Sequence, residues 1–256
     1  TEYGFVSSEA APCMYRLQVK GGYIFHLKYV DDFIDINISH DPEATAQHLA
    51  AMRLNYEYKF EDNLSTFVGV NFQMKEEGIY MHLEKYIRQL SEKFALPMDI
   101  KPVRTPAPVD AAAGPDPSSD DSKLLSKSET RDYQVLVGSL MFAMTMCRPD
   151  IAFCVGLLTR RMATPRRYDA ALAKRCLRYL ISTHRLGILF HSYAQPYPGL
   201  LAYVDSDWAN DPVQRKSTTG YVTVYNGAPV SWLSALQLII ALSSTNAEYV
   251  ALTDCC

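Results

Sequence analysis

The first hundred residues alternate between apolar and polar positions in a way that predicts β-hairpins and helices. Within residues 23–37 the apolar side chains share one face of a strand, and the chain must turn near Asp31 before it runs back. A helical period follows at 43–56, and a second hairpin pattern occupies 64–83. Another helix is expected over 84–96, because its apolar residues recur at helical spacing and a proline follows it. This region should therefore combine antiparallel strands with helices.

The middle of the chain changes from a proline- and serine-rich stretch to helical periodicity. Proline and serine dominate from residue 102 to residue 121, so we expect residues 101–127 to form a flexible linker. Successive helices are predicted after it, with Pro149 at the start of the second. These helices span residues 128–146, 149–163 and 167–182.

Strand signals return after the third of these helices. The strongest is Asn226-Gly227, a dipeptide typical of tight hairpin turns, which joins two alternating runs. The expected strands span 187–191, 199–208, 218–225, 228–234 and 239–244, and a helix is expected over 244–256. An exposed strand edge near 236–243 would be an aggregation risk.

The composition is that of a globular protein without a global basic character. The formal net charge is −3, so any contact with nucleic acid must come from a local patch. The six cysteines lack C-x-x-C spacing, which favours a reducing compartment over a zinc site. No apolar run is long enough to cross a bilayer and no signal peptide opens the sequence, so we expect an intracellular protein, cytoplasmic or nuclear, without a membrane partner. Both ends look cut from something longer, because the chain begins without Met and ends inside an expected helix.

Two groups of acidic residues are candidates for metal binding. Asp31 and Asp32 are adjacent at a predicted hairpin tip among bulky apolar residues, and a divalent cation is the usual partner of such a pair; an ordinary acidic turn is the alternative. Asp205 and Asp207 end an apolar strand, and Glu248 lies near the start of a helix, so they can converge on one metal. Alternatively, Glu248 closes a capping box in "TNAE".

The predicted helix 167–182 has one apolar side and one basic side. The basic side carries Arg167, Lys174, Arg175 and Arg178, in a segment with almost no acidic residues. Such a patch in an acidic chain suggests contact with a phosphate backbone, although a basic helix face is often simply solvated. The apolar stripe consists of Ala173, Cys176, Leu177, Leu180 and Ile181.

Several short motifs follow one another in a fixed order along the chain. They are "YVDD" at 29–32, "FVGVNF" at 67–72, "KYI" at 85–87, "GSLMFAMTMCRPDIAF" at 138–153, "LRYL" at 177–180, "YVDSDWANDP" at 203–212, "RKSTTGYV" at 215–222 and "ALSSTNAEYVAL" at 241–252. Together they resemble the Pol polyprotein of copia-type LTR retrotransposons, over the C-terminal part of reverse transcriptase and the N-terminal part of ribonuclease H. The resemblance covers nearly the whole chain.

The resemblance implies an α+β fold with partial reverse-transcriptase palm hairpins and thumb and connection helices, followed by an incomplete ribonuclease H-like α/β unit. The implied parts are a partial palm and thumb at 1–100, the linker at 101–127, a helical connection at 128–190 and a truncated ribonuclease H-like domain at 191–256.

The resemblance also implies a chemistry. Asp31 and Asp32 match two of the three palm aspartates that hold Mg²⁺ for nucleotidyl transfer, and Asp205 and Glu248 match the first two ribonuclease H carboxylates. The implied substrates are a template–primer and an RNA:DNA hybrid, contacted by the basic face of helix 167–182. The implied protein partner is the rest of the Pol polyprotein.

The sequence also departs from the family pattern. The family's first palm aspartate and its later ribonuclease H acids lie outside these residues, so weak metal binding is expected. Ala11, Leu83 and Asn246 stand where the family favours aspartate, glutamine and glutamate. Lys28 and Asp35 occupy strand positions that the family tends to keep apolar, and burying either charge unpaired would cost several kcal/mol. These departures indicate a truncated or decayed element.

Three hypotheses follow for the function. The first is a fragment of an RNA-directed DNA polymerase and ribonuclease H, inactive or nearly so as this chain. The second is a non-catalytic nucleic-acid-binding module that uses only the basic surface. The third is an inert retrotransposon remnant.

Overall fold

The chain folds into two compact units. The computed structural model describes residues 4–55, 61, 64–193 and 199–256, and the units span Thr1–Val68 and Gly69–Cys256. The boundary thus lies within the second predicted hairpin pattern, 64–83, whereas the sequence placed its first boundary at residue 100. Each unit is described by itself below.

The first unit contains an antiparallel sheet in the order β1-β2-β3-β4. Its elements are β1 (Val6–Ser7), β2 (Met14–Val19), β3 (Gly22–Tyr29), β4 (Asp32–Asn37), α1 (Pro42–Asn55) and β5 (Thr66–Phe67). The predicted hairpin is confirmed, because Tyr29 pairs with Asp32 and leaves Val30 and Asp31 as the turn. The predicted helix after it is also confirmed, although its last expected residue, Tyr56, lies outside the described residues.

The turn between β3 and β4 carries backbone strain. Val30 has a φ of 53°, in the left-handed region that a β-branched residue rarely adopts. Its side chain is 72% exposed. The hairpin therefore holds its tip in an unfavourable conformation, and the flanking strand pairing must stabilise it.

Asp35, whose charge the sequence placed unfavourably in a strand, has two histidine partners. Its carboxylate accepts a hydrogen bond from His26 Nδ1 at 2.7 Å, and His48 Nε2 of α1 lies 3.4 Å from the other oxygen. Burial raises the pKa of Asp35, but the interactions with His26 and His48 outweigh it and lower the pKa to about 2. Lys28 is exposed. The expected cost of an unpaired buried charge therefore does not arise at either position.

The second unit begins with a hairpin and a helix, as predicted. Its elements up to residue 191 are β6 (Val70–Lys75), β7 (Gly78–His82), α2 (Glu84–Lys93), the short 3₁₀ helices η1 (Ala111–Ala113) and η2 (Asp120–Ser122), α3 (Lys127–Met146), η3 (Pro149–Ile151), α4 (Ala152–Thr159), α5 (Arg167–Ser182) and β8 (Gly187–His191). The strand β8 pairs antiparallel with β7, from Gly78 opposite His191 to His82 opposite Gly187. Residues far apart in sequence thus complete one sheet.

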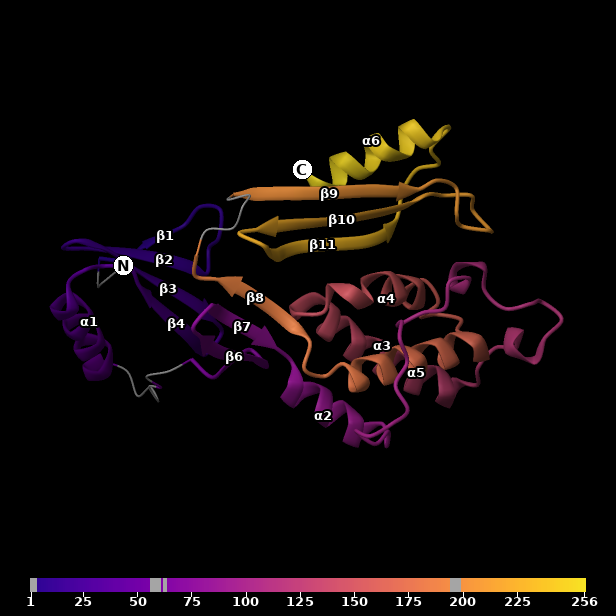
Figure 1. The fold of residues 1–256 in the computed structure, drawn as a ribbon, viewed down its shortest axis with the longest axis horizontal. Helices are drawn as coiled ribbons and strands as arrows, with labels where there is room; N and C mark the ends of the chain where they lie inside the picture. Colours follow the sequence, from indigo (N-terminus) through magenta and orange to yellow (C-terminus); the bar gives the residue numbers. More distant parts are fainter. Residues whose placement is uncertain (1–3, 56–60, 62–63, 194–198) are drawn as a thin grey trace. The chain divides into compact units, whose positions relative to one another are not determined.

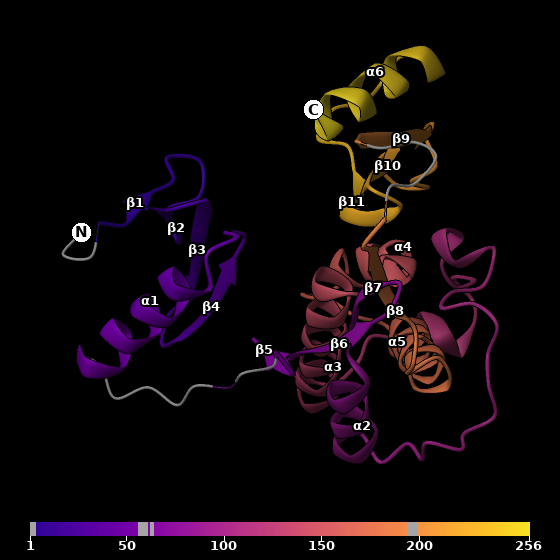
Figure 2. The ribbon, with the colours of Figure 1, turned by 60° about the vertical axis from the view of Figure 1, so that its left-hand side comes forward.

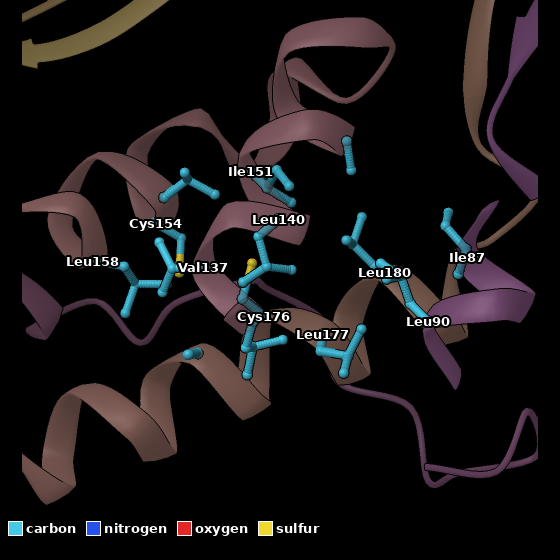
Figure 3. Close-up of a cluster of buried hydrophobic side chains, with 14 of the residues drawn as sticks. Ile87, Leu90, Val137, Leu140, Ile151, Cys154, Leu158, Cys176, Leu177 and Leu180 are labelled. Atoms are coloured by element: carbon cyan, nitrogen blue, oxygen red, sulfur yellow. The ribbon is translucent and has the colours of Figure 1, made fainter. Parts of the chain in front are cut away.

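The helices of the second unit share one hydrophobic core. All five residues of the predicted apolar stripe on α5 are fully buried. They pack with side chains of α2, α3 and α4, as Figure 3 shows for Leu177, Leu180, Val137 and Leu158. The helical periodicity of the sequence therefore identified the buried face correctly.

A buried arginine connects the segment after α3 with the end of α5. Arg148 is 1% exposed, and its guanidinium binds both carboxylate oxygens of Asp150, at 2.7 and 2.9 Å. It also donates to the carbonyl oxygen and the hydroxyl of Thr183, and it lies over the ring of Tyr179. One side chain thus fixes three points of the fold, and every contact is charge-assisted or cation–π.

Residues 101–122, called the strap below, belong to the segment 101–127 that was predicted as a flexible linker, and they pack against the helices of the second unit. The strap lies along α5 (Figure 2), and Ala111 within it is only 4% exposed. The carbonyl oxygen of Pro106 accepts from the thiol of Cys154, and that of Lys101 accepts from Arg178. Side chains of the helices thus satisfy carbonyl groups in the first part of the strap, and hydrogen bonds within the strap, such as that from the N–H of Ala111 to the carbonyl oxygen of Pro108, hold its second part.

The C-terminal part of the second unit is an antiparallel sheet covered by a helix. Its elements are β9 (Leu200–Asp207), β10 (Thr218–Tyr225), β11 (Ala228–Leu236) and α6 (Ser244–Cys255), with the strands in the order β11-β10-β9. The predicted turn is confirmed, because Asn226 and Gly227 both have positive φ, at 48° and 84°. The helix α6 packs on β9 and β10 (Figure 1), and Asp254 accepts a hydrogen bond from Thr219.

The strand predicted at 239–244 does not form, although the structure describes all of these residues. The chain leaves the sheet at Gln237, which is 3% exposed and donates its side-chain amide to the carbonyl oxygen of Ala247 in α6. Leu238 and Leu242 after it are 91% and 86% exposed. The expected exposed strand edge is therefore an exposed apolar loop.

Candidate functional site

Asp31 and Asp32 lie together at the tip of the β3–β4 hairpin. Both side chains are exposed, and the neighbouring Tyr29 and Val30 are more than half exposed. The bulky apolar residues around the pair therefore do not shield this turn from solvent. The two carboxylates are adjacent and accessible, which suits either a cation with a bound phosphate or an ordinary acidic turn.

Glu248 lies beside the strand that carries Asp205 and Asp207. Its Oε1 accepts a hydrogen bond from the backbone N–H of Ser206, the residue between the two aspartates, at 3.3 Å. The helix α6 is capped instead by Ser243, whose hydroxyl accepts from the N–H of Asn246. The capping-box alternative for Glu248 is therefore wrong, and Glu248 contacts the backbone of β9 between Asp205 and Asp207.

The strand geometry turns Asp205 and Asp207 away from the face on which α6 packs, because Ser206 pairs with Thr219, which donates a hydrogen bond to Asp254 of α6. Asp205 and Asp207 are two residues apart on β9 and so share one face of the sheet, whereas Ser206 faces the other. Both aspartates are exposed. Next to them, Trp208 is held by a hydrogen bond from its indole N–H to the carbonyl oxygen of Ala241. The end of β9 is thus anchored beside α6.

The donor atoms at both places fit magnesium in type. Mg²⁺ prefers oxygen ligands and is often held by one or two carboxylates, with waters and substrate phosphates completing its shell. Asp31 with Asp32, and Asp205 with Glu248, each supply two carboxylates. Among the residues that the structure describes, no group of three or more His, Cys, Asp or Glu side chains could hold a metal ion. A metal at either site would therefore depend on a phosphate or on further ligands.

The four predicted nucleic-acid-binding residues of α5 face different surroundings. Arg175 donates to the hydroxyl of Thr105 at 3.1 Å. Arg178 donates to the strap at Lys101, as described above. Arg167 pairs with Asp120 of the strap while remaining half exposed, and Lys174 is exposed. The strap therefore contacts three of the four basic side chains.

Sequence reasoning missed the strap as the partner of this basic face. A signal was present, because Asp120 and Asp121 in "DPSSDD" carry the charge opposite to that of the basic segment 160–178. Composition alone favoured a linker, since proline and serine are typical of one. Thr105 carried no such signal.

Comparison with known proteins identifies several relatives of the chain. It is 31% identical over 255 residues to the "Retrovirus-related Pol polyprotein from transposon TNT 1-94" of Nicotiana tabacum, and 30% identical over 246 residues to that from transposon RE1 of Arabidopsis thaliana. It is 30% identical over 253 residues to the "Putative transposon Ty5-1 protein" of Saccharomyces cerevisiae, which covers 98% of the chain and 79% of that relative. The chain belongs to the copia-type retrotransposon Pol family.

The copia-type Pol family includes relatives much longer than this chain. The matches cover 98% and 96% of the chain but only 19% and 16% of the two Pol polyproteins. No protein-family model and no solved structure matches the chain. In the described residues, none of the helices combines the length and apolar character needed to cross a membrane.

Proposed function

We propose that this chain is a reverse-transcriptase and ribonuclease H segment of a copia-type Pol polyprotein. Its substrates would be a template–primer at Asp31 and Asp32 and an RNA:DNA hybrid at Asp205 and Glu248. The observation that carries the proposal is the contact of Glu248 with the backbone beside Asp205, because it places a helix acid next to the strand that carries the other acid. Membership of the Pol family supports the same assignment.

The roles of the residues follow from their chemistry. The carboxylates of Asp205 and Glu248 would hold Mg²⁺ beside a scissile phosphate of the RNA strand, and Asp31 and Asp32 would do so beside a primer terminus. When bound, Mg²⁺ supplies charge neutralisation at the phosphate and activates a water or hydroxyl. Because the strained turn at Val30 is exposed, the carboxylates of Asp31 and Asp32 would be accessible to a substrate.

The proposal is tested by metal binding, with Mn²⁺ as a spectroscopic probe for Mg²⁺. Free Mn²⁺ is measured by electron paramagnetic resonance in the wild-type chain and in the variants Asp205→Asn and Glu248→Gln. We expect each variant to weaken binding at that site by at least about tenfold, because each removes a charged ligand. The exposed Asp132→Asn on α3 is the matched control and should leave binding unchanged. Unchanged binding in both site variants would refute the ribonuclease H assignment.

The palm site is tested in the same way and separately. Asp31→Asn and Asp32→Asn should each weaken Mn²⁺ binding without affecting the site at Asp205. Cleavage of a labelled RNA:DNA hybrid and extension of a primer are then measured with Mg²⁺. Activity that survives the matching Asp→Asn change would show that these carboxylates do not act in it.

Binding without catalysis is a second candidate, favoured by the exposure of Lys174 and Arg167 on α5. It predicts that the chain binds a fluorescent hybrid with an affinity that falls steeply as salt rises, because phosphate contacts release counterions. Lys174→Ala should weaken this binding and Asp205→Asn should not. Binding that responds to neither salt nor Lys174→Ala would exclude this candidate.

A further inference from the structure

The hydroxyl group of Thr105 in the strap lies against the guanidinium of Arg175 in α5. Thr105 lies in a stretch without regular secondary structure, and its side chain is exposed. Its Oγ1 accepts a hydrogen bond from a terminal guanidinium nitrogen of Arg175 at 3.1 Å. Basic residues continue around it, with Arg104 next to it in the chain and exposed Lys174 next to Arg175. An accessible hydroxyl is thus already placed against positive charge.

Thr105 is followed by Pro106, and the sequence holds a second Thr-Pro pair at Thr164-Pro165. The two pairs differ in access. Pro165 is buried, and its carbonyl oxygen accepts a hydrogen bond from the N–H of Leu125, whereas Pro106 is partly exposed. A protein kinase that selects threonine by the following proline must contact that proline. In the first pair both the threonine and the proline are accessible to such a kinase, whereas in the second the proline is not.

We propose that Thr105 is a phosphorylation site for a proline-directed protein kinase, and that the phosphate binds Arg175 and fastens the strap to α5. In this transfer the Thr105 oxygen attacks the γ-phosphorus of ATP. The new oxygen–phosphorus bond forms as the bond to ADP breaks, and the hydroxyl proton passes to the kinase's base.

The expected strengthening follows from the charges involved. A phosphothreonine carries about −1.5 to −2 charges and three acceptor oxygens, and it orders a segment when it lies opposite arginine. The hydrogen bond from the cationic Arg175 to a neutral hydroxyl would become an ion pair with an anionic phosphate, which guanidinium and phosphate can make in bidentate form. Arg178, one helical turn further along α5, already binds the strap at Lys101. The phosphate would therefore add to an existing contact.

A consequence for nucleic-acid binding rests on the proposed function, whereas the modification itself does not. Phosphate on Thr105 would neutralise Arg175 and hold the strap over part of the basic face. Affinity for a hybrid should then fall. If the chain binds no nucleic acid, the phosphorylation and its effect on the strap remain measurable.

The test treats the whole chain with a purified cyclin-dependent kinase and ATP and locates phosphate by mass spectrometry. We expect phosphate on Thr105, lost in Thr105→Val and retained in Thr164→Val. Hydrogen exchange of peptides within 101–108 should then slow by at least about threefold, because the strap opens less often. This slowing should disappear in Arg175→Gln and persist in the control Lys127→Gln.

Two results would overturn the proposal. One is the absence of phosphate on Thr105 under conditions in which the kinase modifies a Thr-Pro peptide of the same sequence. The other is phosphorylated Thr105 with unchanged exchange in the strap. Because Arg175→Gln also removes the positive charge beside the unmodified strap, Arg175→Lys, which keeps the charge, serves as the second variant and should retain part of the slowing.

Discussion

Replacing Asp35 with asparagine should destabilise the unit Thr1–Val68. The ionised carboxylate accepts from His26 and lies 3.4 Å from His48, so it joins β3, β4 and α1. Asparagine has nearly the same shape but no charge. The variant therefore tests the electrostatic part of this junction while leaving most of the packing in place.

The magnitude follows from the pKa of Asp35, which falls from its ordinary 3.8 to about 2 in the folded chain. Each unit of pKa corresponds to about 1.4 kcal/mol, so the ionised form contributes about 2.5 kcal/mol to the free energy of unfolding at neutral pH. Because the folded pKa is the lower one, this contribution is fully present above pH 3.8. It is lost as the pH falls through about 2. In Asp35→Asn this part of the acid dependence should be absent.

The assay must report on this unit alone. Both tryptophans, Trp208 and Trp232, belong to the other unit, so their fluorescence does not follow it. Hydrogen exchange in increasing urea, resolved by mass spectrometry for peptides of β3, β4 and α1, gives the free energy of local unfolding. Measurements at pH 7 and at pH 2.5 separate the charge effect.

The exposed Glu9→Gln in the same unit is the control and should change the free energy of unfolding very little. A loss of less than about 0.5 kcal/mol in Asp35→Asn at pH 7 would refute the reasoning, since it is well below the value from the pKa. So would an equal loss at pH 7 and at pH 2.5, because the effect would then not depend on the charge.

Three further changes concern the second unit, and each is measured by urea unfolding followed through tryptophan fluorescence, with the exposed Arg131→Ala as control. Arg148→Ala should cost about 3–5 kcal/mol, because it leaves Asp150 and Thr183 without their buried partner, and a cost near that of the control would contradict this. Leu177→Ala should cost about 2–5 kcal/mol by opening a cavity in the core, and a smaller loss would mean that the helices close around it. Gly78→Ala should prevent β7 from pairing with β8, because its Cβ would lie 1.9 Å from a backbone oxygen where φ is 147°; a normally folded variant would exclude this strand register.

Local signals in the sequence were sufficient for most of the elements. The turn at Asn226-Gly227 depends on two neighbouring residues that tolerate positive φ, and the buried face of α5 depends on spacing within one helix. The proximity of Glu248 to the strand of Asp205 was predicted from a strand end and a helix start, and the capping box was a fair alternative because both depend on the same residue type. The order of elements could therefore be predicted before their contacts.

Contacts between distant segments could not be predicted in this way. Asp35 looked misplaced because its partner His26 follows from strand register and His48 from the packing of a helix. The residues 239–244 have the composition of a strand, but the preceding Gln237 binds α6 and directs the chain out of the sheet. The strap has the composition of a linker, yet it is held by side chains of α4 and α5.

The pairing of β7 with β8 has a consequence for biosynthesis. His82 is paired with Gly187, so the outer edge of this sheet is completed only after about a hundred further residues have been made. At about 5–20 residues per second, a ribosome needs roughly 5–20 s for that stretch. During this time the emerging hairpin presents an open edge to any other nascent strand. Translation speed between these two strands should therefore influence the yield of soluble chain, and pausing within this interval should favour aggregation.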